Sequence, residues 1–202
     1  MARPRSVPEG DALERALLVF WEHGYDRTSI SDLCKAIGVG PSSIYNAFGS
    51  KEALYRRALE HYMGTHANVA GEVLASDEQQ DAGTLARSLL RAVAKLYTAP
   101  GLPGGCALFQ SAGASAPSLS EASAVSHEFK LGLENAIQRR FQACARAGDE
   151  LAASPRVLAQ FVLATMRGLS QLATDGATRR DLLKVADHAA ASCLARTLPS
   201  VS

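Results

Sequence analysis

The sequence lacks any apolar run of the roughly 18 residues that a membrane-spanning helix needs. Its N-terminus also lacks the apolar segment and small-residue cleavage site of a secretory signal. We therefore expect a cytoplasmic protein with no membrane partner. Charge of one sign is missing as well, because 21 Lys and Arg residues stand against 20 Asp and Glu residues. The net charge of +1 gives no indication of nucleic-acid or membrane binding for the chain as a whole.

Cysteine is scarce, and the four cysteines, at positions 34, 106, 144 and 193, form no C-x-x-C pair. This spacing favours reduced thiols over a disulfide framework or a zinc site. The five histidines show no metal-ligand spacing with cysteines or acidic residues. A G-x-S-x-G elbow and a phosphate-binding glycine loop are missing too. These absences argue against an enzyme, and we expect no catalytic residues, no metal and no cofactor.

Strand-like alternation is also missing, whereas helical periodicity runs through almost the whole chain, which is 47% hydrophobic. We therefore expect an all-α protein of about nine helices. Short helices come first, followed by a larger helical body. The expected helices cover about 11–23, 29–38, 41–47, 51–75, 81–98, a short stretch after 106, a stretch around 125–141, a stretch around 158–172, and 179–198.

The segment AIGVGPSSIYNAFGSKEAL, residues 36–54, has unusually closely spaced helix ends. Gly38 and Gly49 are placed to end helices, while Pro41 and Ser50 favour new helix starts. Helices this short bury little core, so their spacing indicates a purpose other than stability. A helix, a tight turn and a second helix form the geometry that presents one helix to the DNA major groove.

We therefore predict two domains. A helix-turn-helix domain for DNA binding covers residues 1–50 and begins with a flexible basic arm over residues 1–8. A helical domain for ligand binding and dimerisation covers residues 51–202. Within residues 1–63 eight basic side chains are matched by eight acidic ones, so the positions of the charges, and not their sum, support DNA binding.

Polar side chains of the predicted third helix, PSSIYNAF, lie opposite its apolar pair Ile44 and Phe48. Hydroxyl and amide groups bind base edges or phosphates, and the N–H groups at a helix start bind anions. Arginines in the arm either enter a minor groove or belong to a solvated tail. The predicted base-reading residues are Ser42, Ser43 and Asn46. The predicted backbone contacts are Ser29, Tyr45, Lys51, Arg3 and Arg5.

Residues from about 11 to 62 resemble the DNA-binding domain of the TetR family of bacterial transcriptional repressors. The resemblance is carried by F-W-E-H-G-Y before T-S-I, by G-V-G-P-S-S-I-Y and by F-G-S-K-E-A-L. Much of the family has a His before the Phe, where this chain has Ala47, as in a subgroup with Y-x-A-F-G. The resemblance implies an all-helical homodimer in which the last two helices pair with those of the partner. It also implies an unidentified small-molecule inducer bound in the larger domain.

Cys106 follows two glycines, in the expected first turn of a short helix, where a helix start favours a thiolate. It resembles the cysteine of a TetR subgroup in which some members sense electrophiles or oxidants. The alternative is a small apolar residue packed in the core. Cys34 is expected to be such a core residue.

Apolar residues of the body either line an inducer cavity or form solid core. Small residues in the last two helices either allow close approach of a partner or simply favour helix formation. The pocket and sensor candidates are Cys106, Phe109, Phe129, Leu133, Phe161 and Met166. The dimer-interface candidates are Ala164, Gly168, Leu169, Leu172, Ala190 and Leu194.

The sequence thus predicts a DNA-binding transcriptional regulator, a repressor released from double-stranded DNA by a small molecule or by thiol modification. A homodimer would recognise an inverted-repeat operator. The alternative is a helical small-molecule-binding protein, or an enzyme, that keeps the motif without specific DNA binding. Salt-dependent, sequence-selective DNA affinity separates the two possibilities.

Overall fold

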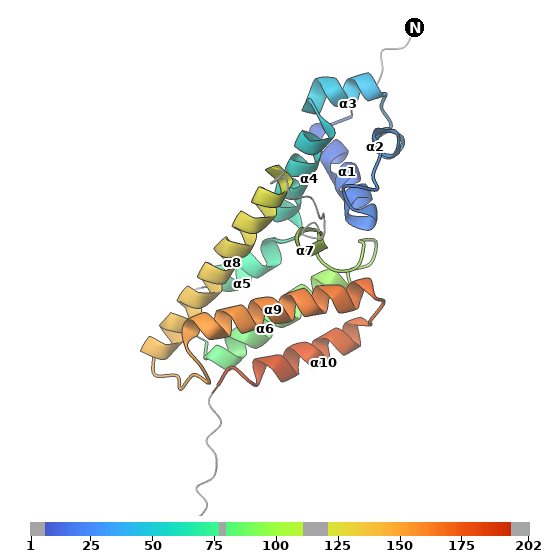
Figure 1. Cartoon of the computed structure of the whole chain (residues 1–202). Helices are drawn as coiled ribbons and strands as arrows, with labels where there is room; N and C mark the ends of the chain where they lie inside the picture. The colour runs from blue at the N-terminus through green and yellow to red at the C-terminus, as the bar shows by residue number, and fades with distance from the viewer. Residues whose placement is uncertain (1–6, 77–79, 111–120, 195–202) are drawn as a thin grey trace, which may run out of the picture. The chain divides into compact units, whose positions relative to one another are not determined.

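A computed structural model describes residues 7–76, 80–110 and 121–194, and Figure 1 shows that these residues form helices joined by short connections. The described part of the chain contains no β-strand, only an isolated bridge between Leu151 and Leu194. None of its helices is long and apolar enough to cross a membrane. The predicted all-α fold is confirmed. The helices are α1 (Glu9–His23), α2 (Ile30–Ile37), α3 (Pro41–Phe48), α4 (Lys51–Thr65), α5 (Asn68–Ala75), α6 (Ala82–Tyr97), α7 (Ala107–Gln110), α8 (Glu121–Arg146), α9 (Pro155–Thr174) and α10 (Arg179–Ala190).

Two helix ends differ from the prediction. The expected fourth helix breaks into α4 and α5, because the amides of His66 and Ala67 both donate to the carbonyl of Tyr62 and end α4 there. The last helix ends at Ala190, and not near residue 198, because Cys193 N–H bonds to the Ala190 carbonyl and tightens the chain into a turn. Residues 195–198 lie outside the described residues, as does the predicted break at 115–118.

The chain divides into two compact units. Unit 1 comprises Met1–Ala67 and Cys106–Phe129, and unit 2 comprises Asn68–Gly105 and Lys130–Ser202. The predicted boundary after residue 50 does not coincide with these limits, because α4 packs along α1 inside unit 1. As the limit of the DNA-binding function, that boundary stays a prediction.

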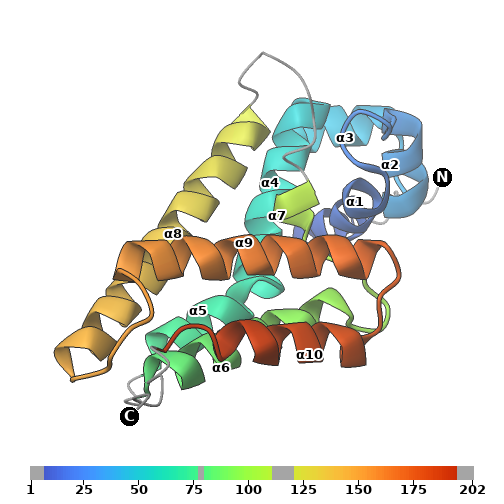
Figure 2. The same ribbon diagram turned by 60° about the horizontal axis from the view of Figure 1, so that its bottom comes forward.

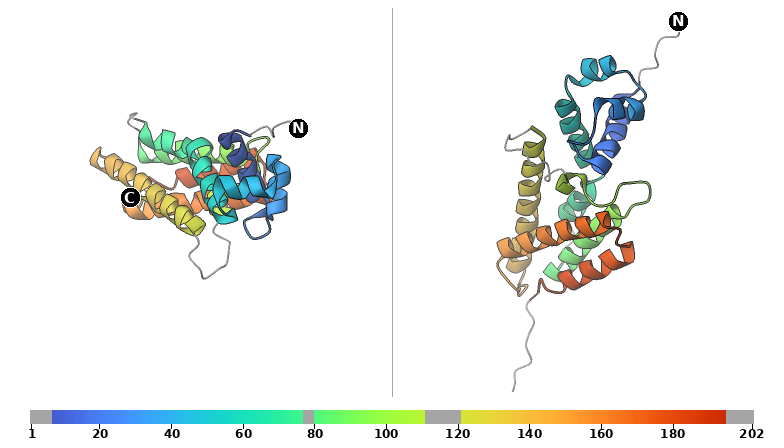
Figure 3. Two further views of the ribbon diagram at one scale, coloured as in Figure 1. Left: turned by 90° about the horizontal axis from the view of Figure 1, so that it is seen from above. Right: turned by 45° about the vertical axis from the view of Figure 1, so that its right-hand side comes forward.

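Unit 1 is organised around the contact between α1 and α4, with α2, α3 and α7 packed against this pair (Figure 3). Aromatic rings form much of the α1–α4 contact: the centroids of Phe20 and Tyr55 are 4.7 Å apart, and those of Trp21 and Tyr62 are 5.0 Å apart. Such pairs stabilise a core beyond the area that they bury. The apolar face predicted for the first helix is confirmed, since all its members are buried: Leu13, Ala16, Leu17, Phe20 and Trp21.

Unit 2 is built on α6, α9 and α10, which pack against one another, with α9 and α10 running side by side (Figure 2). Leucines of α6 fill the space between them, including Leu89 and Leu90, which are buried. At the surface the guanidinium of Arg91 donates to the Asp187 carboxylate at 2.8 Å and joins α6 to α10.

Gly104 allows the chain after α6 to lie directly against the end of α9. A Cβ atom at this position would lie 2.7 Å from the carbonyl oxygen of Ala173, a backbone atom that cannot move freely. We expect Gly104→Ala to lower the free energy of unfolding by about 1–3 kcal/mol, as overpacking does. Urea denaturation measures this change.

Gly132 in α8 provides the matched control, because a Cβ atom added there would meet nothing within 4 Å. Gly132→Ala should leave stability unchanged or raise it by up to about 1 kcal/mol, because alanine favours helix. A Gly104→Ala variant as stable as Gly132→Ala would contradict the steric argument.

Candidate nucleic-acid interface

The reading helix predicted from the sequence corresponds to α3, which begins at Pro41 and ends before Gly49. Ile44 is almost completely buried and anchors α3, while Phe48 is half-buried beneath the guanidinium of Arg57, 5.2 Å from the ring centre. The opposite side of α3 is open to solvent, and the Tyr45 side chain is 49% exposed. The predicted contact residues on that side are all exposed: Ser42, Ser43, Tyr45 and Asn46. The structure therefore leaves these side chains open to a partner as large as double-stranded DNA.

Ser29 caps α2 through the predicted capping box. Its hydroxyl oxygen accepts from the Asp32 amide at 3.2 Å, and the Asp32 carboxylate accepts from the Ser29 amide at 3.0 Å. The Ser29 hydroxyl also donates to that carboxylate at 2.6 Å. These bonds hold the pKa of Asp32 below its ordinary value, so the carboxylate stays charged. A phosphate contact by Ser29 stays a prediction, and it would have to compete with Asp32 for the hydroxyl hydrogen.

Lys51, the first residue of α4, turns its ammonium group toward the chain between α1 and α2. The ammonium donates to the carbonyl oxygens of Tyr25 at 2.8 Å and Thr28 at 2.7 Å, and lies 4.1 Å from the centre of the Tyr25 ring. Burial, and then the charges of Glu52 and Asp26, raise the pKa of Tyr25 above its ordinary value, so the ring is uncharged at neutral pH. The bonds to the Tyr25 and Thr28 carbonyls use two of the three N–H donors of the Lys51 ammonium inside unit 1.

The other cations of this unit are also largely occupied. Arg15 donates to the Ile37 carbonyl at 2.9 Å, and Arg27 donates to the His23 carbonyl at 2.8 Å. Arg56 pairs with Glu60, and Arg57 pairs with Glu9. Lys35 on α2 is exposed and makes no hydrogen bond or ion pair with the described residues. It was not among the predicted contacts. Arg3 and Arg5 lie outside the described residues.

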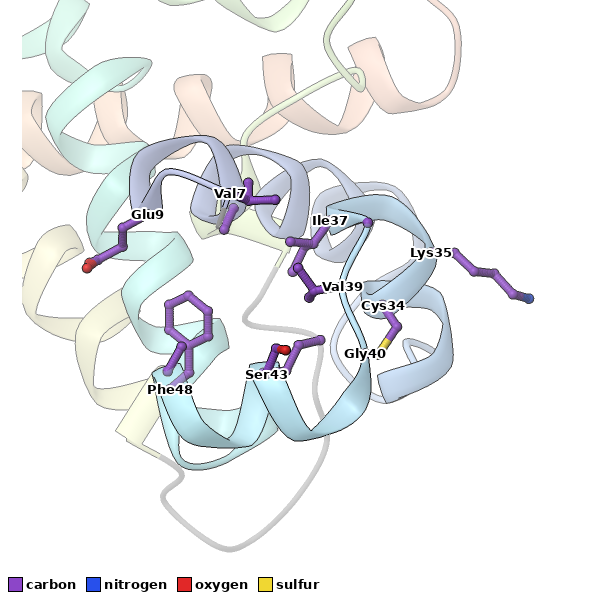
Figure 4. Close-up of a pocket in the computed structure, with 13 residues that line it drawn as sticks. Val7, Glu9, Cys34, Lys35, Ile37, Val39, Gly40, Ser43 and Phe48 are labelled. Carbon is purple, nitrogen blue, oxygen red and sulfur yellow. The ribbon is translucent and has the colours of Figure 1, made fainter. Parts of the chain in front are cut away.

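A groove of about 880 Å³ runs between the start of α1, the end of α2 and α3 (Figure 4). Val7, Ile37, Val39 and Phe48 give it an apolar lining, and the sulfur of Cys34 lies at its side. Cys34 is half-buried, so the expectation that it is a core residue is corrected.

Cys106 lies immediately before α7 and is only 3% exposed. Its carbonyl accepts from the amides of Phe109 and Gln110, so it begins the helix as predicted, but α7 contains four residues and its dipole is correspondingly small. The hydroxyl of Tyr62 donates to the Cys106 sulfur at 3.4 Å. A donor beside the sulfur, and not a long helix, is the feature that would stabilise a thiolate here.

The other pocket candidates do not all lie in the interior. Phe109, Leu133 and Met166 are buried, and Phe129 is half-buried. Phe161 is 39% exposed on the outer side of α9, so its predicted place in an internal pocket is corrected. Its neighbour in the sequence, Val162, occupies the inner side instead. The described residues contain no group of three His, Cys, Asp or Glu side chains that could hold a metal ion.

The outer side of α9 and α10 forms a shallow apolar groove of about 430 Å³, which we call the α9–α10 face. Its large side chains are exposed, including Leu172 at 41% and Val185 at 42%. Alpha-helical spacing puts Phe161, Gly168 and Leu172 on this side, while Val162 and Met166 face inward. A helix that is apolar on two sides is normally covered on both. The residues that line this face are Phe161, Thr165, Gly168, Leu169, Leu172, Val185, His188, Ala189 and Ser192.

The predicted interface residues divide accordingly. Ala164, Gly168 and Leu172 are exposed and available to a partner. Leu169 and Ala190 are almost fully buried, and Leu194 is half-buried against Gly83. Leu169 still lines the α9–α10 face, so its place at the interface stays a prediction, as does that of Leu194. Ala190 is completely covered within unit 2, and its predicted place at the interface is corrected. Phe161 and Val185 were missed as interface residues.

Comparison with known proteins gives matches at three levels. Residues 12–58 match the model of bacterial regulatory proteins of the tetR family. The solved structure of a cysteine mutant of the TetR family transcriptional regulator CifR, complexed with 26-bp double-strand operator DNA, has 32% identity and a TM-score of 0.85, covering 94% of this chain and 99% of that one. The HTH-type transcriptional repressor ComR of Escherichia coli K12 is 28% identical over 91% of this chain and 88% of ComR. The repressor BdcR of the same organism is 32% identical over 54% of each chain.

These matches confirm the predicted family and the prediction of a regulator instead of an enzyme, while the Y-x-A-F-G subgroup stays a prediction. This chain belongs to the TetR family of bacterial regulatory proteins and is a DNA-binding transcriptional regulator.

Proposed function

We propose that this protein is a repressor that binds an inverted-repeat operator as a homodimer. It leaves the operator when a cysteine thiol is modified or when the larger helical domain binds a small-molecule inducer. The observation that carries the proposal is the exposed polar side of α3, held on the protein by the buried Ile44. ComR and BdcR are named repressors, which supports the sign of regulation. A protein that acts on an operator works where the DNA is, so we place it in the cytoplasm.

In this proposal Ser42, Ser43 and Asn46 read base edges, because short hydroxyl and amide side chains on an exposed helix can reach into the major groove. Tyr45, the start of α4 and the arm residues Arg3 and Arg5 contact the DNA backbone or minor groove. Ser29 joins them if a phosphate displaces its bond to Asp32.

The α9–α10 face supports the homodimer. Apolar side chains as exposed as Leu172 and Val185 are unfavourable in water, and an isologous contact would cover the same face on both subunits. Two reading helices would then lie about 34–36 Å apart, one DNA turn, which requires an inverted repeat.

Two release signals are compatible with the chemistry of this chain. A small molecule could bind in the helical body, for which Leu133 and Met166 remain candidate contacts. Alternatively, modification of Cys106 would disturb Tyr62, whose ring packs on Trp21 of α1 inside the same unit. Either event would shift the population away from the DNA-competent conformation. The thiol route has the more specific support, because it begins at a defined contact.

Asn46→Ala tests the reading role of α3. We expect operator affinity to fall by about 1–3 kcal/mol and the preference at one base pair to relax. The operator is first obtained by selection from random double-stranded DNA, and affinities are measured by fluorescence anisotropy at several salt concentrations.

Asn135→Ala is the matched control, because Asn135 is an exposed asparagine on α8. It should bind the operator like wild type. Equal affinity of wild type and Asn46→Ala for the selected sequence would remove Asn46 from the base-reading residues. Failure of wild type to select any sequence would favour a helical ligand-binding protein that keeps the motif without specific DNA binding.

A further inference from the structure

The chain between α1 and α2, residues 24–29, is the part of unit 1 that determines where α2 begins. It contains a turn in which the Thr28 hydroxyl donates to the Gly24 carbonyl at 2.7 Å, and Thr28 itself is almost fully buried. Ser29, the next residue, is the N-cap of α2. The placement of this turn therefore decides the placement of α2, against which α3 packs.

Lys51 is the side chain that connects this turn to another helix. Its ammonium bonds to the carbonyls of Tyr25 and Thr28, 26 and 23 residues away in the sequence, and its remaining side is covered by the Tyr25 ring. That ring is in turn held by Tyr55 of α4, with centroids 5.0 Å apart. A cation bonded to two carbonyls and one ring face has exchanged part of its water for protein contacts.

The two carbonyl oxygens accept hydrogen bonds from the Lys51 ammonium and fix its position without an acidic side chain. Lys51 stands at the first position of α4, where the helix dipole disfavours a positive charge. The two carbonyls offset this effect and draw the ammonium away from the N–H groups of the helix start. At the helix start the Ala53 amide donates to the Ser50 hydroxyl at 3.0 Å, while the charge of Lys51 is committed to the turn.

We propose that Lys51 is a positioning residue for DNA recognition: it ties the start of α4 to the turn before α2 and so sets the angle of the reading helix. This inference rests on the proposed operator binding. In this proposal the electrostatic attraction for the DNA phosphates comes from other cations, namely the exposed Lys35 and the arginines of the arm. The competing role, a phosphate contact by Lys51, is the alternative outcome of the tests below.

The first test uses wild-type protein without DNA, so it does not depend on operator binding. Lysine acetylation by a water-soluble ester is followed residue by residue with mass spectrometry. We expect Lys51 to react at least about ten times more slowly than Lys35, because its nitrogen must leave two carbonyls and the Tyr25 ring before it can attack the ester, whereas Lys35 is exposed. Equal rates for Lys51 and Lys35 in the free protein, with Lys51 protected only when DNA is added, would overturn the proposal.

The second test separates positioning from charge. In Lys51→Met we expect operator affinity to fall about tenfold or more, affinity for random DNA to stay unchanged, and the slope of log affinity against log salt to stay unchanged. A phosphate contact predicts a different result, in which both affinities fall and the slope decreases by about 0.9. Circular dichroism verifies that the variant is folded.

Lys35→Met is the matched control, since it removes one lysine from the same unit without touching the turn. It should keep the ratio of operator affinity to random-DNA affinity. If Lys35→Met lowers this ratio as much as Lys51→Met does, loss of charge explains both results and the positioning role is wrong. If wild type shows no operator preference but Lys51 is still slow to acetylate, the proposed function fails while the contact itself stands.

Discussion

Leu172→Glu will convert the protein from a dimer into a monomer of 21.3 kDa. Leu172 is an exposed apolar side chain on the α9–α10 face. In a two-fold contact the substitution would place a buried charge in each subunit, and an unpaired buried charge is strongly destabilising. Separated subunits lose the linkage between the two half-sites, so operator affinity should fall by about 10²- to 10⁴-fold. Light scattering gives the mass, and anisotropy gives the affinity.

Leu131→Glu is the matched control for this experiment. Leu131 on α8 is as exposed as Leu172, at 46% against 41%, but it does not line the α9–α10 face. This variant should remain a dimer and keep its operator affinity. A Leu172→Glu protein that stays dimeric would place the interface elsewhere, and a wild type that binds the operator fully as a 21.3 kDa monomer would end the dimer proposal.

Alkylation of Cys106 should release the operator completely. The sulfur is buried beside Tyr62, so an added group has no space and must displace that ring from its contact with Trp21. The experiment uses a Cys34→Ser background, because Cys34 is the half-exposed thiol among the four. Mass spectrometry measures which thiol reacts with N-ethylmaleimide at pH 7, and anisotropy follows DNA release in the same sample.

Two internal controls come from the remaining thiols. Burial raises the pKa of Cys193 to about 11, and burial, followed by the charge of Asp149, raises the pKa of Cys144. Both are therefore neutral thiols at pH 7, and we expect them to react more slowly than Cys106, because neither has a hydroxyl donor like that of Tyr62 bonded to its sulfur among the described contacts. The raised pKa also means that Cys193 becomes reactive only as pH rises toward 11 or when the fold opens. If Cys34→Ser/Cys106→Ser is released just as readily, the thiol is packing and the signal is a reversibly bound ligand.

Local chemistry made the helices of unit 1 predictable. The capping box at Ser29, the proline at Pro41 and the cap at Ser50 act within three or four residues of themselves, so sequence alone indicates where these helices begin. The inward Ile44 follows from helical spacing in the same way. Asn46 lies two residues after Ile44, on another side of the helix, so its exposure follows from the same spacing.

Contacts between distant residues were not predictable in this way. Lys51 meets carbonyls more than 20 residues earlier in the chain, and no residue pattern announces a bond to backbone atoms. The end of α4 depends on two amides that share the Tyr62 carbonyl, which weak helix propensities around His66 do not reveal. Ala190 was misplaced for a different reason: in the run of alanines at 189–191 the sequence does not say which one faces its own unit.

The division of unit 1 into two stretches of chain has a consequence for its synthesis. Residues 68–105 must leave the ribosome before Cys106 and α7 can join α1 and α4. At ordinary translation speeds these 38 residues take about two to eight seconds. For that time Tyr62 exists without the sulfur that accepts its hydroxyl in the finished protein. A synthetic regulator made by grafting residues 1–67 onto another body would preserve this unfinished condition permanently, with its DNA-reading helices present and the Cys106 thiol absent.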